Sequence, residues 1–139
     1  MIPIVRRVLD EVQAHADAEA PRECCGMLIG DATRVVDHVR ATNLAEGTTR
    51  FLIDPHDHIR ALRDARSRGL DVVGFYHSHP RSRAYPSPTD VAECGYAGVL
   101  HLIVGKDETG APEARLFSID GETIAEVVYA VATNDPPSP

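Results

Sequence analysis

Apolar residues recur at three- and four-residue intervals in two stretches of the chain, and this spacing predicts two amphipathic helices. The first stretch covers residues 3–18 and ends before Pro21. The second covers residues 55–68, follows Asp54 and ends at Gly69, which is a residue typical of a helix C-cap. The apolar positions of the first stretch are Ile4, Val5, Val8, Leu9 and Val12.

Shorter apolar or alternating runs, bounded by turn residues, predict strands. Residues 24–29 and 34–40 are expected to form a hairpin. A short third helix is expected to begin after Ser87 as its N-cap and to extend to about residue 97. The remaining predicted strands are residues 50–53, 72–79, 99–104, 114–119 and 123–131. The order of these elements predicts a mixed α/β fold.

Length and composition predict one ordinary globular domain. The chain has 139 residues, of which 43% are hydrophobic and 25% are charged. We expect residues 1–132 to form this domain and residues 133–139, which have little to bury, to form a flexible C-terminal tail. No apolar run approaches the roughly 20 residues needed to span a bilayer, and the N-terminus lacks a signal-peptide core, which predicts a cytoplasmic protein without a membrane partner.

Charge and cysteine content exclude two further classes of function. The formal net charge of -7 disfavours binding to phosphate backbones, so no nucleic-acid partner is expected. The three cysteines, Cys24, Cys25 and Cys94, are odd in number and two are adjacent, which disfavours a disulfide-stapled secreted protein. We expect them to be reduced and buried. A deaminase-type zinc site would require His-x-Glu and Cys-x-x-Cys, and neither is present.

The segment from residue 75 to residue 90 carries the residues with clear chemistry. His77 and His79 are two apart in a predicted strand, so both imidazoles can face one point. Pro80 ends that strand, and the following loop can return Asp90 from the first turn of the third helix. Two imidazoles and one carboxylate leave a fourth position open, as in catalytic zinc sites. The pattern therefore indicates a metal centre that activates water.

The spacing of these residues resembles the JAMM motif of the MPN-domain metalloproteases. A glutamate, His-x-His, seven residues, a serine, two residues and an aspartate occur here as Glu23, His77, His79, Ser87 and Asp90. The flanking sequences Pro-Arg-Glu-Cys-Cys-Gly from residue 21 and Tyr-His-Ser-His from residue 76 are similar to those of short bacterial members. The similarity in motif and element order covers residues 3–131.

The resemblance implies a fold, a mechanism and a substrate class. The fold would be a single MPN domain, cytidine-deaminase-like, with a mostly antiparallel sheet flanked by helices. His77, His79 and Asp90 would hold one zinc ion, Glu23 would be the general base and acid, and Ser87 would donate to the oxyanion. Family members cleave amide bonds after the C-terminal Gly-Gly of ubiquitin-like proteins. Short bacterial members act on sulfur carriers, from which one of them releases cysteine. The brief connection at residues 43–49 is shorter than the ubiquitin-gripping insertion of several deubiquitinases.

Other interpretations compete with this one. A catalytically silent MPN scaffold is disfavoured because every ligand position is filled, and a DNA-repair role is disfavoured by the acidic balance. His56 and His58 have the spacing of the motif but lie at a predicted helix start, where residues two apart diverge. A weaker hypothesis is that Arg81 and Arg83 bind the carboxylate of a leaving amino acid or acidic residues of the carrier.

Overall fold

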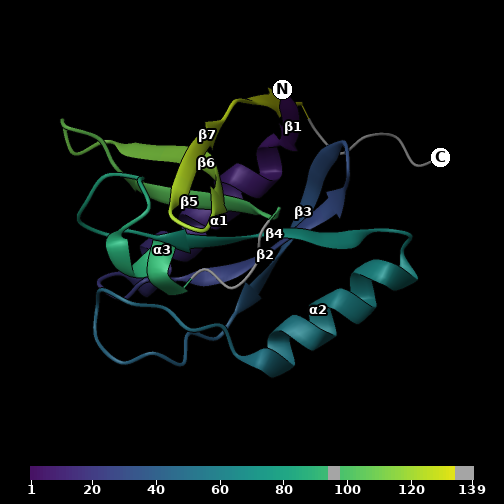
Figure 1. Ribbon diagram of the computed structural model, residues 1–139, viewed down its shortest axis with the longest axis horizontal. Helices are drawn as coiled ribbons and strands as arrows, with labels where there is room; N and C mark the ends of the chain where they lie inside the picture. Colours follow the sequence, from purple (N-terminus) through teal and green to yellow (C-terminus); the bar gives the residue numbers. More distant parts are fainter. Residues whose placement is uncertain (94–97, 134–139) are drawn as a thin grey trace.

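The computed structural model describes residues 1–93 and 98–133, in which eleven helices and strands follow one another (Figure 1). Strands and helices are mixed throughout this part of the chain, which confirms the predicted α/β fold class. The elements are β1 (Ile2–Val5), α1 (Arg6–Glu19), β2 (Cys25–Asp31), β3 (Arg34–Ala41), α2 (Pro55–Ser67), β4 (Asp71–Ser78), α3 (Pro88–Glu93), β5 (Leu100–Lys106), β6 (Pro112–Asp120), β7 (Thr123–Val127) and β8 (Tyr129–Ala132).

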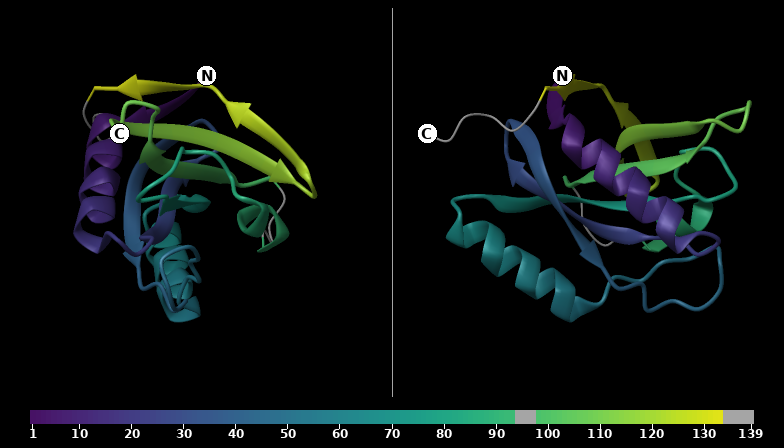
Figure 2. Two further views of the ribbon diagram at one scale, coloured as in Figure 1. Left: turned by 90° about the vertical axis from the view of Figure 1, so that its left-hand side faces the viewer. Right: turned by 180° about the vertical axis from the view of Figure 1, so that it is seen from behind.

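The strands form one strongly curled sheet in the order β7-β6-β5-β4-β2-β3-β1-β8. The pairs β2–β3, β2–β4, β5–β6 and β6–β7 are antiparallel, and β1–β3, β1–β8 and β4–β5 are parallel. Its two end strands, β7 and β8, are consecutive in sequence and are separated only by Val128. The chain therefore passes from one end of the sheet directly to the other, and Figure 2 shows this segment arching over the curled sheet.

Two helices cover opposite faces of this sheet, as the two views of Figure 2 show. On one face, Val8, Val12 and Ala16 of α1 pack into a core that also contains Tyr76 of β4 and Leu102 of β5. On the other face, Ala61 and Ala65 of α2 pack on a second core. The strand residues of that second core are Met27, Ile29 and Phe75. Alternate residues of β4 thus belong to different cores, as the twofold periodicity of strands requires.

The N-terminal prediction was wrong in its first residues. Ile4 and Val5 are buried in strand β1, where Ile4 pairs with both β3 and β8, and the helix begins only at Arg6. Ile4 keeps the four-residue spacing to Val8 and Val12, and all three belong to the same core. Apolar spacing alone therefore could not separate a short strand from the helix that continues it.

Two other predicted strands differ from the structure. Residues 50–53 form no strand, and only Ile53 makes an isolated bridge, with Asn43. The stretch predicted as one strand from 123 to 131 is divided into β7 and β8, which pair with opposite ends of the sheet. The end of the third helix predicted near residue 97, and Cys94 with it, lies outside the described residues, as does the tail from residue 134. The domain and tail boundaries therefore stay predictions.

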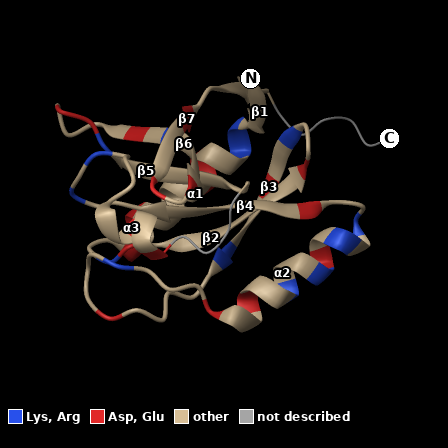
Figure 3. Ribbon diagram, viewed as in Figure 1, with Lys and Arg blue, Asp and Glu red and all other residues tan. Residues whose placement is uncertain are grey.

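No helix in the described parts of the chain is both long and apolar enough to cross a bilayer. Basic and acidic residues are interspersed along the chain, most visibly on α2 (Figure 3).

Candidate metal centre

β4 delivers two histidines to one point at its C-terminal end. His77 pairs with Cys25 of β2 and Ile103 of β5, in the middle of the sheet. His79 follows the strand, and its amide still donates to the carbonyl of Val104 at 2.8 Å. Both imidazoles are buried, and their Nε2 atoms lie 3.2 Å apart. The strand therefore holds both rings on one side of the sheet, as their spacing predicted.

Asp90 reaches the same point from the first turn of α3. Its Oδ2 atom lies 3.0 Å from His77 Nε2 and 3.1 Å from His79 Nε2. Ser87 and Asp90 form a reciprocal cap, in which the Asp90 amide donates to Ser87 Oγ at 3.0 Å and the Ser87 amide donates to Asp90 Oδ2 at 2.9 Å. Because Ser87 Oγ is an acceptor in this cap, its own hydroxyl proton remains available to a substrate.

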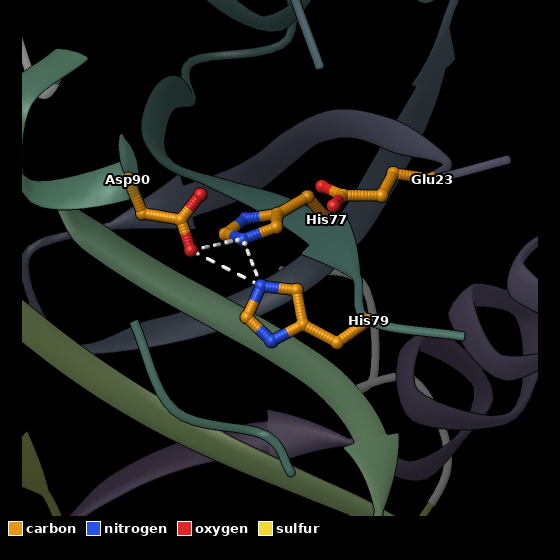
Figure 4. Close-up of side chains that lie close together, drawn as sticks. All are labelled: Glu23, His77, His79 and Asp90. Atoms are coloured by element: carbon orange, nitrogen blue, oxygen red, sulfur yellow. Dashed lines mark hydrogen bonds and ion pairs between the residues drawn. The ribbon is translucent and has the colours of Figure 1, made fainter. Parts of the chain in front are cut away.

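Glu23 approaches from a segment that belongs to no helix or strand, just before β2. Pairing of the next-but-one residue, Cys25, with His77 places Glu23 beside the histidines. Its side chain is buried, and its Oε1 atom has no hydrogen-bond partner among residues 1–93 and 98–133. Figure 4 shows the carboxyl group on the opposite side of His77 from Asp90. One ligand-type atom from each of the four residues Glu23, His77, His79 and Asp90 lies within 4.8 Å of every other.

These donor atoms fit a divalent cation. His79 Nδ1 donates to the Arg83 carbonyl at 2.9 Å, which leaves Nε2 as the ring nitrogen that faces His77 and Asp90. When the ring is neutral, the lone pair of Nε2 therefore points to this position. Tetrahedral ligation at about 2.0–2.1 Å separates donor atoms by roughly 3.3–3.4 Å. The observed separations between His77, His79 and Asp90 are 3.0–3.2 Å. These closely spaced nitrogen and oxygen atoms, together with a Glu23 oxygen that has no hydrogen-bond partner among the described residues, are surroundings that a cation would satisfy.

The electrostatics of the cluster favour a positive charge at this point. Burial opposes ionisation of Asp90, but hydrogen bonds from His77 and His79 outweigh it and hold the pKa of Asp90 well below its usual range. Burial lowers the pKa of His77. Burial acts in the same direction on His79, but the hydrogen bonds to Asp90 and to the Arg83 carbonyl, together with the nearby carboxylates, outweigh it and raise the pKa. Burial raises the pKa of Glu23 to about 7. The anionic Asp90 is thus stabilised only by cationic or proton-donating neighbours.

The loop between β4 and α3 fixes the orientation of His79. Arg83 provides the carbonyl that accepts from His79, while its guanidinium group pairs with Glu113 at 2.6 Å and Glu108 at 2.9 Å. The side chain of Arg83 therefore anchors the loop, in contrast to the hypothesis that it receives a substrate carboxylate. Arg81 is exposed. The loop also packs closely on β5, because a Cβ atom at Gly105 would lie 2.5 Å from the Ser82 carbonyl.

A largely apolar cavity of about 490 Å³ adjoins the cluster. The residues that line it include Phe75, His77, His101 and residues 50–53. The ring of Phe51 stacks on His77 with centroids 4.3 Å apart and an interplanar angle of 22°. Burial lowers the pKa of His101 to about 4, so its imidazole is neutral near pH 7. A cavity of this size beside candidate ligands gives a substrate access to them.

Several other residues behave as expected. His56 and His58 lie in the first turn of α2 and are not part of the cluster. Cys24 and Cys25 are buried free thiols, whose pKa values burial raises to about 11 and about 12. Asn43 lies among turn-forming residues and no sequence pattern singled it out, although its side-chain amide donates to the carbonyl of Glu23. Only the three-dimensional contact identifies it.

Comparisons with known proteins agree with this geometry. A family model described as prokaryotic homologs of the JAB domain matches residues 5–120. A desampylase of Haloferax volcanii is 35% identical, over 72% of this chain and 74% of its own. A probable TtuB-protein conjugate cleaving protease of Thermus thermophilus is 34% identical, over 90% of this chain and 81% of its own. A CysO-cysteine peptidase of Mycobacterium tuberculosis is 29% identical, over 89% of this chain and 87% of its own.

Solved structures share the fold. A protein from Desulfitobacterium hafniense superposes with a TM-score of 0.87 at 28% identity, covering 96% of this chain and 94% of its own. A structure described as a JAMM metalloprotease-like zinc site in the proteasome and signalosome has a TM-score of 0.59 at 20% identity, covering 95% of this chain and 98% of its own. At this lower identity the similarity establishes the arrangement of helices and strands alone.

Proposed function

Since this chain belongs to the family of prokaryotic JAB-domain homologues, the JAMM-type peptidases, we propose that its buried cluster is a zinc site that hydrolyses conjugates of a ubiquitin-like protein. His77, His79 and Asp90 hold the metal, and Glu23 and Ser87 act on the substrate. The observation that carries this proposal is the convergence of donor atoms from Glu23, His77, His79 and Asp90 within 4.8 Å, at the edge of an open cavity.

The residues of this chain divide the chemistry among them. When bound, zinc supplies Lewis acidity that polarises the scissile carbonyl and lowers the pKa of a water molecule toward about 7. Glu23, whose burial makes it a stronger base than an exposed carboxylate, accepts a proton from the attacking water as the new C–O bond forms. It then delivers that proton to the amine nitrogen as the C–N bond breaks. The Ser87 hydroxyl donates to the carbonyl oxygen, which is worth roughly 3 kcal/mol in the transition state.

The proposed substrate is the amide bond after the C-terminal Gly-Gly of a ubiquitin-like sulfur carrier, and the product is cysteine or another amine. Support comes from the names of the relatives, which act on conjugates of TtuB and of CysO or are desampylases. The cavity beside His77 and Asp90 can receive the chain that flanks the scissile bond. The connection between β3 and α2 contributes residues 50–53 to the lining of this cavity.

The test uses zinc-loaded protein and a carrier that ends in Gly-Gly, such as CysO, extended by one amide-linked cysteine. Intact-mass spectrometry follows the loss of the cysteine residue, and the metal content is measured on the same samples. Glu23→Gln should retain zinc but abolish hydrolysis, because the amide cannot accept the proton. His77→Ala should lose both zinc and hydrolysis.

Controls separate the parts of the proposal. A carrier that ends in Ala-Ala before the cysteine should not be cleaved, because side chains would be added next to the scissile carbonyl. Full turnover by Glu23→Gln would remove Glu23 from its role. If wild-type protein purified without chelator binds no zinc, the proposed hydrolase activity is refuted and the catalytically silent JAMM scaffold is favoured.

A further inference from the structure

The position of Glu23 depends on contacts outside its own segment. Glu23 and Cys24 precede β2, and the peptide unit between them belongs to no strand. A carboxylate that transfers protons must nevertheless stay within hydrogen-bond reach of the reacting atoms. The structure shows which groups hold the peptide unit that joins Glu23 to Cys24.

Asn43 holds the carbonyl end of this peptide unit. Its Nδ2 atom donates to the Glu23 carbonyl at 3.0 Å and to the Arg50 carbonyl at 3.1 Å. Its Oδ1 atom accepts from the amides of Ala45 and Leu52, both at 2.9 Å. All hydrogen-bonding capacity of the side-chain amide is used, and rotation of the amide by 180° would bring donors against donors. The orientation of Asn43 is thereby determined.

Ser78 holds the other end of the same peptide unit. The Cys24 amide donates to Ser78 Oγ at 2.8 Å, and the Ser78 amide donates to the Cys24 carbonyl at 3.2 Å. Ser78 is 1% exposed and lies between the two histidines on the opposite face of β4. The peptide unit is therefore fixed at its carbonyl by the loop and at its amide by the strand that carries the metal-binding histidines.

The loop adds a second link to the same segment. Arg22 donates to the carbonyls of Asn43 and Ala45, at 3.0 and 2.7 Å. Asn43 in turn fixes Arg50 and Leu52, the two neighbours of Phe51, whose ring stacks on His77. The side-chain amide of Asn43 therefore contacts both the backbone of Glu23 and the backbone on either side of Phe51.

We propose that Asn43 and Ser78 are positioning residues that clamp the Glu23–Cys24 peptide unit and thereby place the Glu23 carboxylate over the reacting atoms. This inference rests on the proposed role of Glu23. Neither residue touches the substrate or the metal; each acts through the backbone of Glu23. Within the part of the chain that the structure describes, Oε1 of Glu23 has no hydrogen-bond partner, so the backbone clamp and not a contact at that oxygen determines where the side chain begins.

Asn43→Asp is the sharpest variant, because it keeps the shape and both acceptor contacts but replaces the Nδ2 donor to the Glu23 and Arg50 carbonyls with an oxygen. We expect kcat on the CysO–cysteine substrate to fall roughly 10- to 100-fold with KM and zinc content unchanged. Asn43→Ala and Ser78→Ala should show the same split between kcat and KM. Asp31→Ala is the matched control. It removes a hydrogen bond of the same kind, in which the Thr33 amide donates to the Asp31 carboxylate in the remote β2–β3 turn, and it should leave kcat unchanged.

Amide hydrogen exchange measured by NMR without substrate gives a second result that does not depend on activity. In Asn43→Asp, the Cys24 amide should exchange faster, while the Ala45 and Leu52 amides stay protected because Oδ1 is retained. In Asn43→Ala, all three should exchange faster. Unchanged protection of Cys24 in both variants would overturn the clamp even if either variant proved unstable.

The activity results distinguish the two proposals. An inactive wild type, or an active Glu23→Gln, refutes the proposed function and leaves the exchange experiment to decide the clamp. If wild type is active and Glu23→Gln is not, full kcat in Asn43→Asp refutes the clamp alone. Loss of zinc, or a raised KM at unchanged kcat, would assign Asn43 to metal retention or substrate binding and would also overturn the inference.

Discussion

Replacement of Tyr76 by phenylalanine should destabilise the fold without affecting the metal centre. The Tyr76 hydroxyl lies 2.7 Å from His15 Nδ1, and neither residue is more than 3% exposed. Burial raises the pKa of Tyr76 and lowers the pKa of His15, so the phenol donates to a neutral imidazole. Tyr76→Phe removes the donor and leaves a buried acceptor without a partner, which costs about 1–3 kcal/mol.

Urea unfolding at pH 7 with a chelator present measures this loss without a contribution from bound metal. The midpoint should fall with an unchanged m-value. Tyr129→Phe is the matched control, because its phenol donates to the Ala114 carbonyl at 2.8 Å from a half-buried position that water can reach after the substitution. That variant should lose only about 0.5–1 kcal/mol.

Zinc content and turnover of Tyr76→Phe should match wild type, because Tyr76 and His77 project from opposite faces of β4. Equal losses of stability in the two tyrosine variants would show that the contact between His15 and Tyr76 contributes nothing specific. A loss of zinc affinity at unchanged stability would show that Tyr76 supports the metal centre instead of the α1 core.

Two further predictions concern the loop after β4 and the pH dependence of stability. Gly105→Ala should lose about 1–3 kcal/mol of stability and should turn over substrate more slowly, because the added Cβ atom would displace the backbone of the loop that orients His79. Gly121→Ala is the control: its φ of 60° in the β6–β7 turn is its only strain, so it should lose stability alone. Because the pKa of His15 is lowered in the folded state, the unfolded chain takes up its proton first, and stability should fall as pH drops through the unfolded value of about 6.5. In His15→Gln, urea titrations between pH 7 and pH 5 should show a shallower fall, and an identical pH dependence would contradict the assignment.

Local pattern predicted those parts of the site that lie close together in sequence. The twofold period of a strand places His77 beside His79, and a capping arrangement places Ser87 against Asp90. The distance between Glu23 and the histidines depends instead on the antiparallel register of β2 and β4, which local pattern does not specify. Only the resemblance to a family motif linked Glu23 to the other residues before the structure was known.

The errors in the fold have the same physical origin. Ile4 pairs with β3 and with β8, the last strand of the described residues, so β1 depends on partners that are distant in sequence. Residues 50–53 have the composition of a strand, but the amide of Asn43 takes the Leu52 N–H and the Arg50 carbonyl that a neighbouring strand would use. A side chain that competes for backbone groups is not visible in a pattern of apolar positions.

The residue between the two histidines illustrates what such patterns leave out. In a His-x-His strand, the middle side chain points away from the metal, and the sequence alone gives it no role. Here that side chain is Ser78, whose buried hydroxyl group accepts from the amide that follows Glu23. β4 and the residue that follows it therefore present the two candidate histidine ligands on one side, and Ser78 anchors the segment of the candidate base on the other, so movement of this strand moves all three together. A larger or apolar middle residue would keep the ligand spacing but leave the Cys24 amide without its acceptor. Ser78 thus links the candidate base to the candidate histidine ligands through the backbone.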